Sequence, residues 1–196
     1  MARRVRAYVG LGANVGDARA NLVNAARALA ALPRVTLRGV SPLYRTRPVG
    51  VKNQPDFLNA VAALDVPSGP DPETGALALL VALKELESAL GRRPRQRWGP
   101  REVDLDLLVF GRHAISVERP DGRWPEVPHP AARERLFVLA PLGDLAPGLR
   151  PPRWKATVES TRRRVTRSQA AGAVELVAEW DASQRQWHAR PRLLPE

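Results

Sequence analysis

Two carboxylates separated by one residue give the strongest chemical signal in this chain. Asp104 and Asp106 stand inside the apolar segment 103–110, directly after a Gly-Pro turn. Alternate residues of a β-strand point to one face, so both carboxylates would project together, roughly 6–7 Å apart. Because unpaired charge in an apolar strand is costly, they need a partner. That partner is either a hard cation or, on a solvated edge strand, nearby arginines.

The neighbouring residues favour phosphate chemistry. Arg97 and Arg101 flank the turn, and a guanidinium group binds phosphate oxygens in pairs. Carboxylates with few other ligands suit Mg²⁺ that is also bound by substrate phosphates. The opposite face of the same strand is apolar and is expected to face the core, with Val103, Leu105, Leu107 and Val109.

The known phosphate-binding loops are absent. Glycines 10, 12 and 16 follow a G-x-G-x-x-x-G spacing, which differs from the dinucleotide fingerprint, and the chain has no G-x-x-x-x-G-K-[ST] motif. Any phosphate would therefore be held by side chains and metal. His129 lies between two prolines, which stiffen its backbone, with Arg133 and Arg135 following. It is either part of an anion-binding wall or a structural loop histidine.

Composition limits the class of protein. The 196 residues are 44% hydrophobic, enough for one domain with a core. The chain has no cysteine, which excludes disulfides and thiolate metal sites. No apolar run approaches the ~20 residues of a membrane span, and the N-terminus lacks a signal-peptide pattern. We expect a cytoplasmic protein without a membrane partner.

The net charge of +11 raises a rival class, a nucleic-acid-binding module. Residues 150–196 hold ten Lys and Arg against five Asp and Glu, so the basic excess is concentrated in the last quarter. Such modules interleave basic and aromatic residues, but aromatics make up only 5% of this chain. We therefore expect no nucleic-acid partner. A metal-dependent nuclease is a third candidate, although no further acids cluster near the pair.

Hydrophobic periodicity predicts an α+β fold. Strands are expected at 6–12, 35–44, 57–66 and 103–110. One helix is expected to follow an Asp17 N-cap and stop at Pro33, and a second to run from Asp71 to Gly91. A Pro- and Gly-rich loop is expected at 119–130 and a short helix at 133–142. The order strand, helix, strand, strand, helix, strand is that of a ferredoxin-like split βαβ core.

The C-terminal part reads differently. From Pro147 the chain is rich in Pro and Arg, with one β-like run at 173–180. This part is either an appended hairpin or partly disordered. We expect a catalytic domain at 1–149 and a basic C-terminal extension at 150–196.

Several segments in this order resemble one enzyme family, 6-hydroxymethyl-7,8-dihydropterin pyrophosphokinase. They are YVGLGANVGD (8–17), SPLYRTRPVG (41–50), QPDFLNAV (54–61), LESALGR (86–92), RWGPREVDLDLLVFG (97–111), VPHP (127–130) and ERLFVLAPLGDLAP (134–147). The resemblance implies a ferredoxin-like α+β fold. It also implies transfer of pyrophosphate from ATP to the pterin hydroxymethyl group, with release of AMP in folate biosynthesis.

The resemblance also implies roles for individual residues. The implied catalytic residues are Arg92, Arg101, Asp104 and Asp106, of which Asp104 and Asp106 bind two Mg²⁺ ions. The implied ATP-binding residues are Arg92, Trp98, Arg101, Leu107, His129 and Arg135. The implied pterin-binding residues are Thr46, Val49, Phe57, Asn59 and Phe137, with the two phenylalanines sandwiching the ring. The implied partners are the pterin and ATP, and we expect a monomer.

Among the departures from the family pattern, one concerns a phosphate contact. An arginine is common three residues after the glycine of the Gly-Arg pair, where this chain has Pro94 between Arg93 and Arg95. Either neighbour could replace the missing phosphate contact. The loop from 92 to 101, which includes Trp98, is expected to close over bound substrates.

Overall fold

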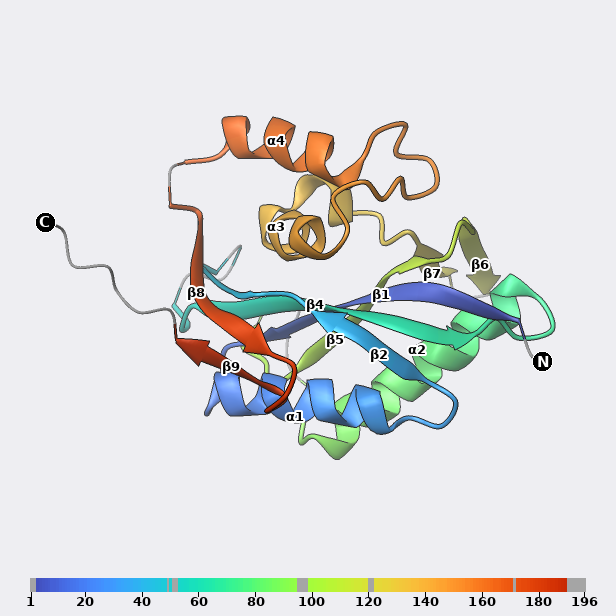
Figure 1. Cartoon of the computed structure of the whole chain (residues 1–196), viewed down its shortest axis with the longest axis horizontal. Helices are drawn as coiled ribbons and strands as arrows, with labels where there is room; N and C mark the ends of the chain where they lie inside the picture. Colours follow the sequence, from blue (N-terminus) through green and yellow to red (C-terminus); the bar gives the residue numbers. More distant parts are fainter. Residues whose placement is uncertain are drawn as a thin grey trace, which may run out of the picture.

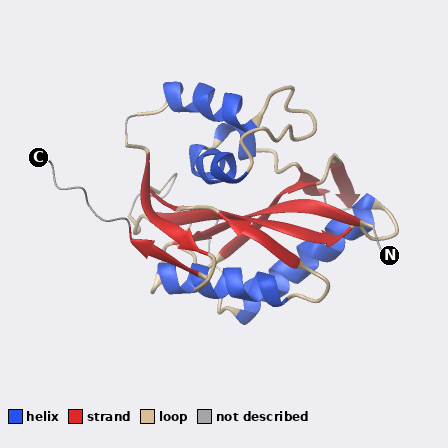
Figure 2. Cartoon of the chain, viewed as in Figure 1, coloured by secondary structure: helices blue, strands red, loops and turns tan. Residues whose placement is uncertain are grey.

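The computed structural model describes residues 3–48, 50, 53–94, 99–119, 122–170 and 172–189. An antiparallel sheet lies between two helical layers (Figure 1), with strands in the middle and helices on both faces (Figure 2). No helix among the described residues is long and apolar enough to cross a membrane. The elements are β1 (Arg4–Ala13), α1 (Ala18–Ala31), β2 (Thr36–Val40), β3 (Leu43–Thr46), β4 (Phe57–Pro67), α2 (Pro72–Ala89), β5 (Asp104–Phe110), β6 (Ile115–Arg119), β7 (Gly122–Val127), α3 (Leu136–Leu145), α4 (Val158–Ser168), β8 (Val174–Asp181) and β9 (Gln186–Ala189).

The main sheet has the strand order β5-β1-β4-β3-β8-β9. Strands β2 and β3 pair with successive parts of β4, β2 with Ala62–Asp65 and β3 with Phe57–Asn59. The first strand β1 is central, between β4 and β5, and is antiparallel to both. The predicted succession of strands and helices up to β5 is confirmed, with the 35–44 run divided into two strands.

The predicted ends of the first two helices are also confirmed. The Asp17 side chain accepts a hydrogen bond from the backbone N–H of Ala20 at the start of α1. Asp71 does the same for Thr74, at 2.8 Å, with Pro72 as the first residue of α2. The chain leaves α2 through Gly91, whose φ of +87° is a conformation that glycine adopts without strain.

Two hydrophobic layers hold the helices to the sheet. The layer under α1 and α2 contains Val9, Leu11, Leu22, Leu29, Leu64, Leu83, Leu105 and Leu107. The layer on the other face, under α3 and α4, contains Tyr8, Val61, Leu108, Val109, Leu139, Leu142 and Val165. Figure 1 shows α3 and α4 above the sheet and α1 and α2 below it.

Three sequence predictions are corrected. The expected loop at 119–130 is wrong, because β7 pairs with β6 in a small hairpin. The short helix begins later than expected, at Leu136, after a 3₁₀ turn at Ala132–Glu134. Val109 does not continue the alternation of β5: the register against β1 shifts between Tyr8 and Val9. A bulge of this kind moves later side chains to the other face, and Val109 joins the α3 layer.

The C-terminal part folds onto the same sheet. Of the two alternatives for the 173–180 run, the structure has the hairpin: β8 pairs with β3, and β9 pairs with β8. The buried Trp187 in β9 donates from Nε1 to the backbone oxygen of Ser41, at 2.9 Å. Helix α4 has no predicted counterpart, because only Val158, Thr161 and Val165 are buried among its basic residues.

Candidate active site

The two carboxylates lie on the sheet face that also carries α3. Leu105 and Leu107 point into the α1–α2 core, so the alternate residues Asp104 and Asp106 face the other way. Across the ladder they stand opposite Gly12 and Gly10, two residues that have no side chain. A Cβ at Gly12 would lie 3.9 Å from the Cβ of Asp104. At Gly10 an added Cβ would instead contact the side chain of Leu108, at 3.5 Å, so the two glycines place only backbone beside the acids.

Asp104 is paired with two arginines. The Nη1 of Arg92 lies 2.9 Å from Oδ1 of Asp104, and Arg101 donates to Oδ2. Beside this cluster is a hollow of about 310 Å³ whose cationic lining residues are Lys84, Arg92, Arg93 and Arg101. Of the two kinds of partner considered from the sequence, a cation or nearby arginines, Asp104 has the arginines.

Asp106 is in a different state. Within the described ranges its carboxylate has no hydrogen-bond or ion-pair partner. Burial raises the pKa of Asp106 above its ordinary value, and the negative charge of Asp104 raises that pKa further. A carboxylate held in this way gains from a nearby cation, which would relieve both effects.

The donor set fits Mg²⁺. Mg²⁺ is bound by oxygen ligands, often one or two carboxylates together with substrate phosphates and water. In the described part of the chain no group of three or more His, Cys, Asp or Glu side chains could hold a metal ion. The pair therefore suits a cation that takes its other ligands from a bound phosphate, and does not suit a cation held by protein alone.

His129 lies near these acids. Its backbone N–H donates to the oxygen of Leu108 on β5, at 3.0 Å, and its Nδ1 accepts from the N–H of Ala131, at 3.2 Å. Burial lowers the pKa of His129, while the charge of Asp106 acts in the opposite direction. A neutral ring that accepts at Nδ1 carries its proton on Nε2. His129 can therefore donate one hydrogen bond from Nε2.

Glu87 is a site residue that the sequence predictions did not include. This carboxylate on α2 is 3% exposed and accepts from the backbone N–H of Leu105, at 2.6 Å. It also pairs with Lys84, at 2.9 Å, and with Arg92. It thus fixes β5 between the two aspartates and holds Arg92. The signal was present in the sequence, because Glu87 follows Leu83 at helical spacing on the buried face of α2.

Asn14 is a second site residue that the sequence predictions did not include. Its Oδ1 accepts from the backbone N–H of Arg101, at 2.7 Å, and its Nδ2 donates to the side chain of Gln54 and the oxygen of Pro55. The loop after β1 is thereby joined to the segments before β5 and before β4. Nothing in the sequence distinguished this asparagine from an ordinary turn residue.

Two residues expected to bind the pterin, Asn59 and Thr46, are in contact where β3 ends and β4 begins. Asn59 on β4 donates from Nδ2 to Oγ1 of Thr46 on β3, at 2.9 Å, and both side chains are buried. Phe57 and Asn59 alternate with core residues of the α1–α2 layer, so they share the face of α3. Phe137 lies on α3, and the Arg135 guanidinium carbon is 5.6 Å from its ring centre.

The remaining expected residues are not brought together in this way. The side chain of Leu107 is buried in the α1–α2 core, on the face away from Asp104 and Asp106. Arg93 is exposed, and its backbone N–H lies 3.4 Å from Glu102. Val49, Arg95 and Trp98 lie outside the described residues.

Residues 8–147 match the family model described as 7,8-dihydro-6-hydroxymethylpterin-pyrophosphokinase, or HPPK. The chain belongs to the HPPK family. A Pseudomonas aeruginosa protein named 2-amino-4-hydroxy-6-hydroxymethyldihydropteridine pyrophosphokinase is 44% identical over 147 residues, which are 75% of this chain and 84% of that protein. A Bacillus subtilis protein of the same name is 40% identical over 139 residues, 71% of this chain and 77% of that protein.

The fold of this HPPK family member is similar to that of a solved structure. The crystal structure of wild-type Plasmodium falciparum HPPK-DHPS aligns with a TM-score of 0.70 at 13% identity. The alignment covers 96% of this chain and 50% of that chain, so the present chain spans about half of its length. The family resemblance inferred from the motifs is confirmed.

Proposed function

We propose that this chain transfers pyrophosphate from ATP to the hydroxymethyl group of 6-hydroxymethyl-7,8-dihydropterin and releases AMP, a step of folate biosynthesis. The match of residues 8–147 to the HPPK family carries this conclusion. Relatives with the same enzyme name at 44% and 40% identity support it. The acid pair with its arginines supplies chemistry that a pyrophosphate transfer requires.

On the phosphate side, we assign Asp104 and Asp106 to two Mg²⁺ ions and Arg92 and Arg101 to the triphosphate. When bound, Mg²⁺ neutralises charge on the phosphate oxygens. Arg92 and Arg101 now face Asp104. Arriving phosphates compete for the same guanidinium donors, so ATP binding exchanges one set of anionic partners for another.

The remaining ATP contacts are assigned more broadly. The neutral His129 can donate from Nε2 to a phosphate oxygen, and Arg135 extends the basic wall. Leu107 can contribute only backbone groups, because its side chain lies in the core. Trp98 is assigned to the segment that covers the nucleotide.

The transfer step needs little from a general base. The pterin hydroxymethyl oxygen attacks the β-phosphorus and loses its proton to water, the bond from this phosphorus to the α-phosphate bridging oxygen breaks, and AMP leaves. A loose transition state of this type demands little activation of the nucleophile. Orientation of the two substrates contributes ~7–11 kcal/mol to the barrier reduction.

On the pterin side, we assign Phe57 and Phe137 to the two faces of the ring. Asn59 and Thr46 read its polar edge together with Val49. The hydrogen bond between Asn59 and Thr46 fixes the amide orientation, leaving Oδ1 and the second N–H of Asn59 available for recognition.

The fold supports a more detailed assignment. Strands β1 and β2 run in the same direction with β4 between them, and β5 borders β1. We infer a ferredoxin-like split βαβ core from this order. We further assign residues 1–149 to the pterin pyrophosphokinase domain and 150–196 to an extension, since the family match ends at 147. We expect the enzyme to act as a monomer.

The deciding experiment is an AMP assay with ATP and Mg²⁺, with and without 6-hydroxymethyl-7,8-dihydropterin. AMP release that depends on the pterin is the expected result. AMP release without pterin, or none with it, would contradict the proposal. Steeply salt-dependent RNA binding together with no pterin turnover would favour the nucleic-acid module instead.

A further inference from the structure

The C-terminal part holds both walls of the assigned pterin slot. One wall is β3, which carries Thr46, and the other is α3, which carries Phe137. In the extension beyond residue 147, β8 pairs with β3 and α4 packs on α3. Thr46 itself is paired with Val174. The slot is thus supported by a part of the chain that the family match does not include.

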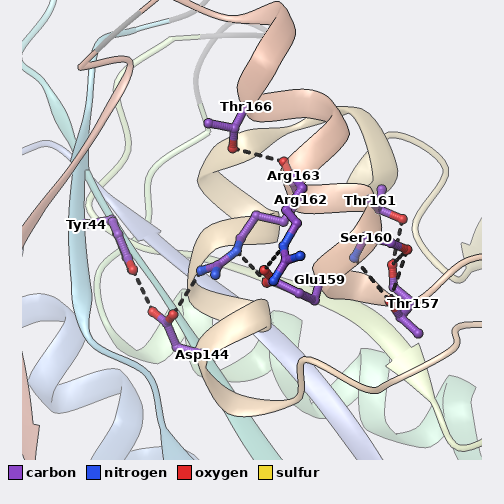
Figure 3. A network of polar contacts seen from close by, with 9 residues as sticks. All are labelled: Tyr44, Asp144, Thr157, Glu159, Ser160, Thr161, Arg162, Arg163 and Thr166. Atoms are coloured by element: carbon purple, nitrogen blue, oxygen red, sulfur yellow. Dashed lines mark hydrogen bonds and ion pairs between the residues drawn. The ribbon is translucent and has the colours of Figure 1, made fainter.

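One chain of side chains joins these elements directly (Figure 3). The hydroxyl of Tyr44 on β3 donates to Oδ2 of Asp144 on α3, at 2.6 Å. The Nη1 of Arg162 on α4 donates to Oδ1 of the same carboxylate, at 3.1 Å. The Asp144 carboxylate therefore receives one donor from the sheet and one from the C-terminal helix.

Tyr44 and Asp144 lie on the same strand and helix as the assigned pterin contacts. Tyr44 precedes Thr46 by two residues, so the two side chains share a face of β3. Asp144 follows Phe137 by seven residues, which is two helical turns or about 10 Å along α3. A change at Tyr44 or Asp144 alters the separation between the strand of Thr46 and the helix of Phe137.

Arg162 is fixed before it reaches Asp144. Its Nε lies 2.8 Å from Oε2 of Glu159, one turn earlier on α4. Its stem crosses α3 at Gly143, where an added Cβ would lie 3.2 Å from Cδ of Arg162. Thr157 caps the same helix by accepting from the N–H of Ser160. A guanidinium group held in this way can act as a rigid strut between α4 and α3.

We propose that Arg162 is a positioning residue for pterin binding: through Asp144 and Tyr44 it sets the spacing between β3 and α3, and so the width of the slot. This inference rests on the proposed function, because it takes Phe57, Phe137, Thr46 and Asn59 as the pterin contacts. Arg162 acts on the slot only through the residues that it holds.

The test compares two arginines of one helix in the full-length chain. Arg162→Met keeps an apolar stem and removes the fork that binds Asp144. Arg163→Met is the matched control, since Arg163 also pairs with Glu159, at 2.7 Å, but is 71% exposed and has no recorded contact with Asp144. We expect Arg162→Met to raise the pterin KM at least about threefold and to leave the ATP KM unchanged.

A second variant tests whether Arg162 acts through Asp144 and Tyr44. Tyr44→Phe removes only the hydroxyl that donates to Asp144. It should raise the pterin KM as Arg162→Met does, and the double variant should show less than the product of the two effects, because both break one chain of contacts. If Arg162→Met does not fold, Arg162→Lys gives the same comparison, because an ammonium group cannot bind Glu159 and Asp144 with one fork.

The outcomes separate the two proposals. Equal effects of Arg162→Met and Arg163→Met, equal rises of both KM values, or a lower melting temperature with both KM values unchanged would overturn the positioning role. Each of these results presumes a wild-type chain that releases AMP in response to pterin. A wild-type chain that releases none would instead overturn the proposed function itself.

Discussion

The two ends of the candidate site are built from different interactions. At the start of β5, Asp104, Arg92, Arg101 and Glu87 are linked by ion pairs. At the end of β3 and the start of β4, Thr46 and Asn59 form one neutral, buried hydrogen bond. The ion pairs of Asp104 with Arg92 and Arg101 join partly exposed groups and can exchange one anion for another, whereas a neutral buried bond gains nothing by opening. We therefore expect the phosphate end to rearrange when ATP binds and the pterin end to be preformed.

The same contrast appears within the acid pair. Asp104 has an arginine on each oxygen. Asp106 has no such partner among the described residues, and burial raises its pKa. The two aspartates thus differ in their surroundings: Asp104 already has two ion-pair partners, whereas Asp106 has none within the described residues and would gain from a bound cation.

The largest expected effect comes from removing the charge of Asp106. Asp106→Asn should lower kcat by at least about a hundredfold, because a cation held at the phosphates contributes several kcal/mol to the reaction. The folded state should be as stable as the wild type or more stable, since the ionised carboxylate is costly where it lies. Steady-state AMP release and thermal unfolding measure the two quantities.

Asp104→Asn is the matched comparison. It should also abolish most turnover, but it should destabilise the fold because Arg92 and Arg101 lose a partner. Near-normal turnover in either variant would refute the assignment of the pair to metal. Equal changes in stability would refute the distinction between the two aspartates.

Glu87→Ala should have the next largest effect. The change leaves the N–H of Leu105 and the guanidinium of Arg92 without their buried acceptor. Breaking a buried pair of this kind costs about 3 kcal/mol of unfolding free energy. Urea denaturation measures the loss, with the exposed Glu85→Ala on the same helix as control. A loss no greater than that of the control would mean that Glu87 does not anchor β5.

Thr46→Val tests the preformed end and should act more weakly. The variant removes the oxygen that accepts from Asn59 Nδ2. An unmade hydrogen bond of this kind costs about 1 kcal/mol, and the pterin KM should rise while the ATP KM stays constant. Thr36→Val, which removes an exposed hydroxyl at the start of β2, is the control. A rise of the ATP KM alone would place Thr46 at the wrong end of the site.

The smallest expected effect is a pH dependence of the difference in unfolding free energy between the wild type and Asp106→Asn. The folded state holds the proton of Asp106 more tightly than the unfolded chain does, because its pKa is raised in the fold. This contribution to stability is present at low pH and is lost as pH rises through the folded pKa. In the absence of ligands, wild-type stability relative to Asp106→Asn should therefore fall with rising pH. A difference that is constant or rises would contradict the burial of an unpaired carboxylate.

Much of the fold could be read from local patterns. The caps at Asp17 and Asp71 and the strands β1 and β4 are properties of short segments, and each was predicted correctly. Helix α4 and the β6–β7 hairpin were missed for a shared reason. The apolar residues of both elements are few. Helix α4 is stabilised by its contacts with α3, which its own sequence pattern does not reveal.

In the candidate site, too, some residues could be found from local sequence patterns and others depend on distant partners. Asp104 and Asp106 were proposed from their residue type and spacing, and the aromatic residues from the resemblance of contiguous motifs to the family. Glu87 contacts Leu105, 18 residues away, and Asn14 contacts Arg101, 87 residues away. A buried carboxylate in a helix was a visible signal for Glu87, whereas Asn14 had none.

The sequence by itself determined the family, the acid pair and its arginines, because the motifs are contiguous and a strand presents alternate residues on one face. Only the tertiary structure decided which acid has a partner, because burial and countercharge depend on residues brought from α2 and from the segments on both sides of β5. It also decided that the extension lies against the pterin slot, because pairing of β8 with β3 is a contact that no local pattern encodes.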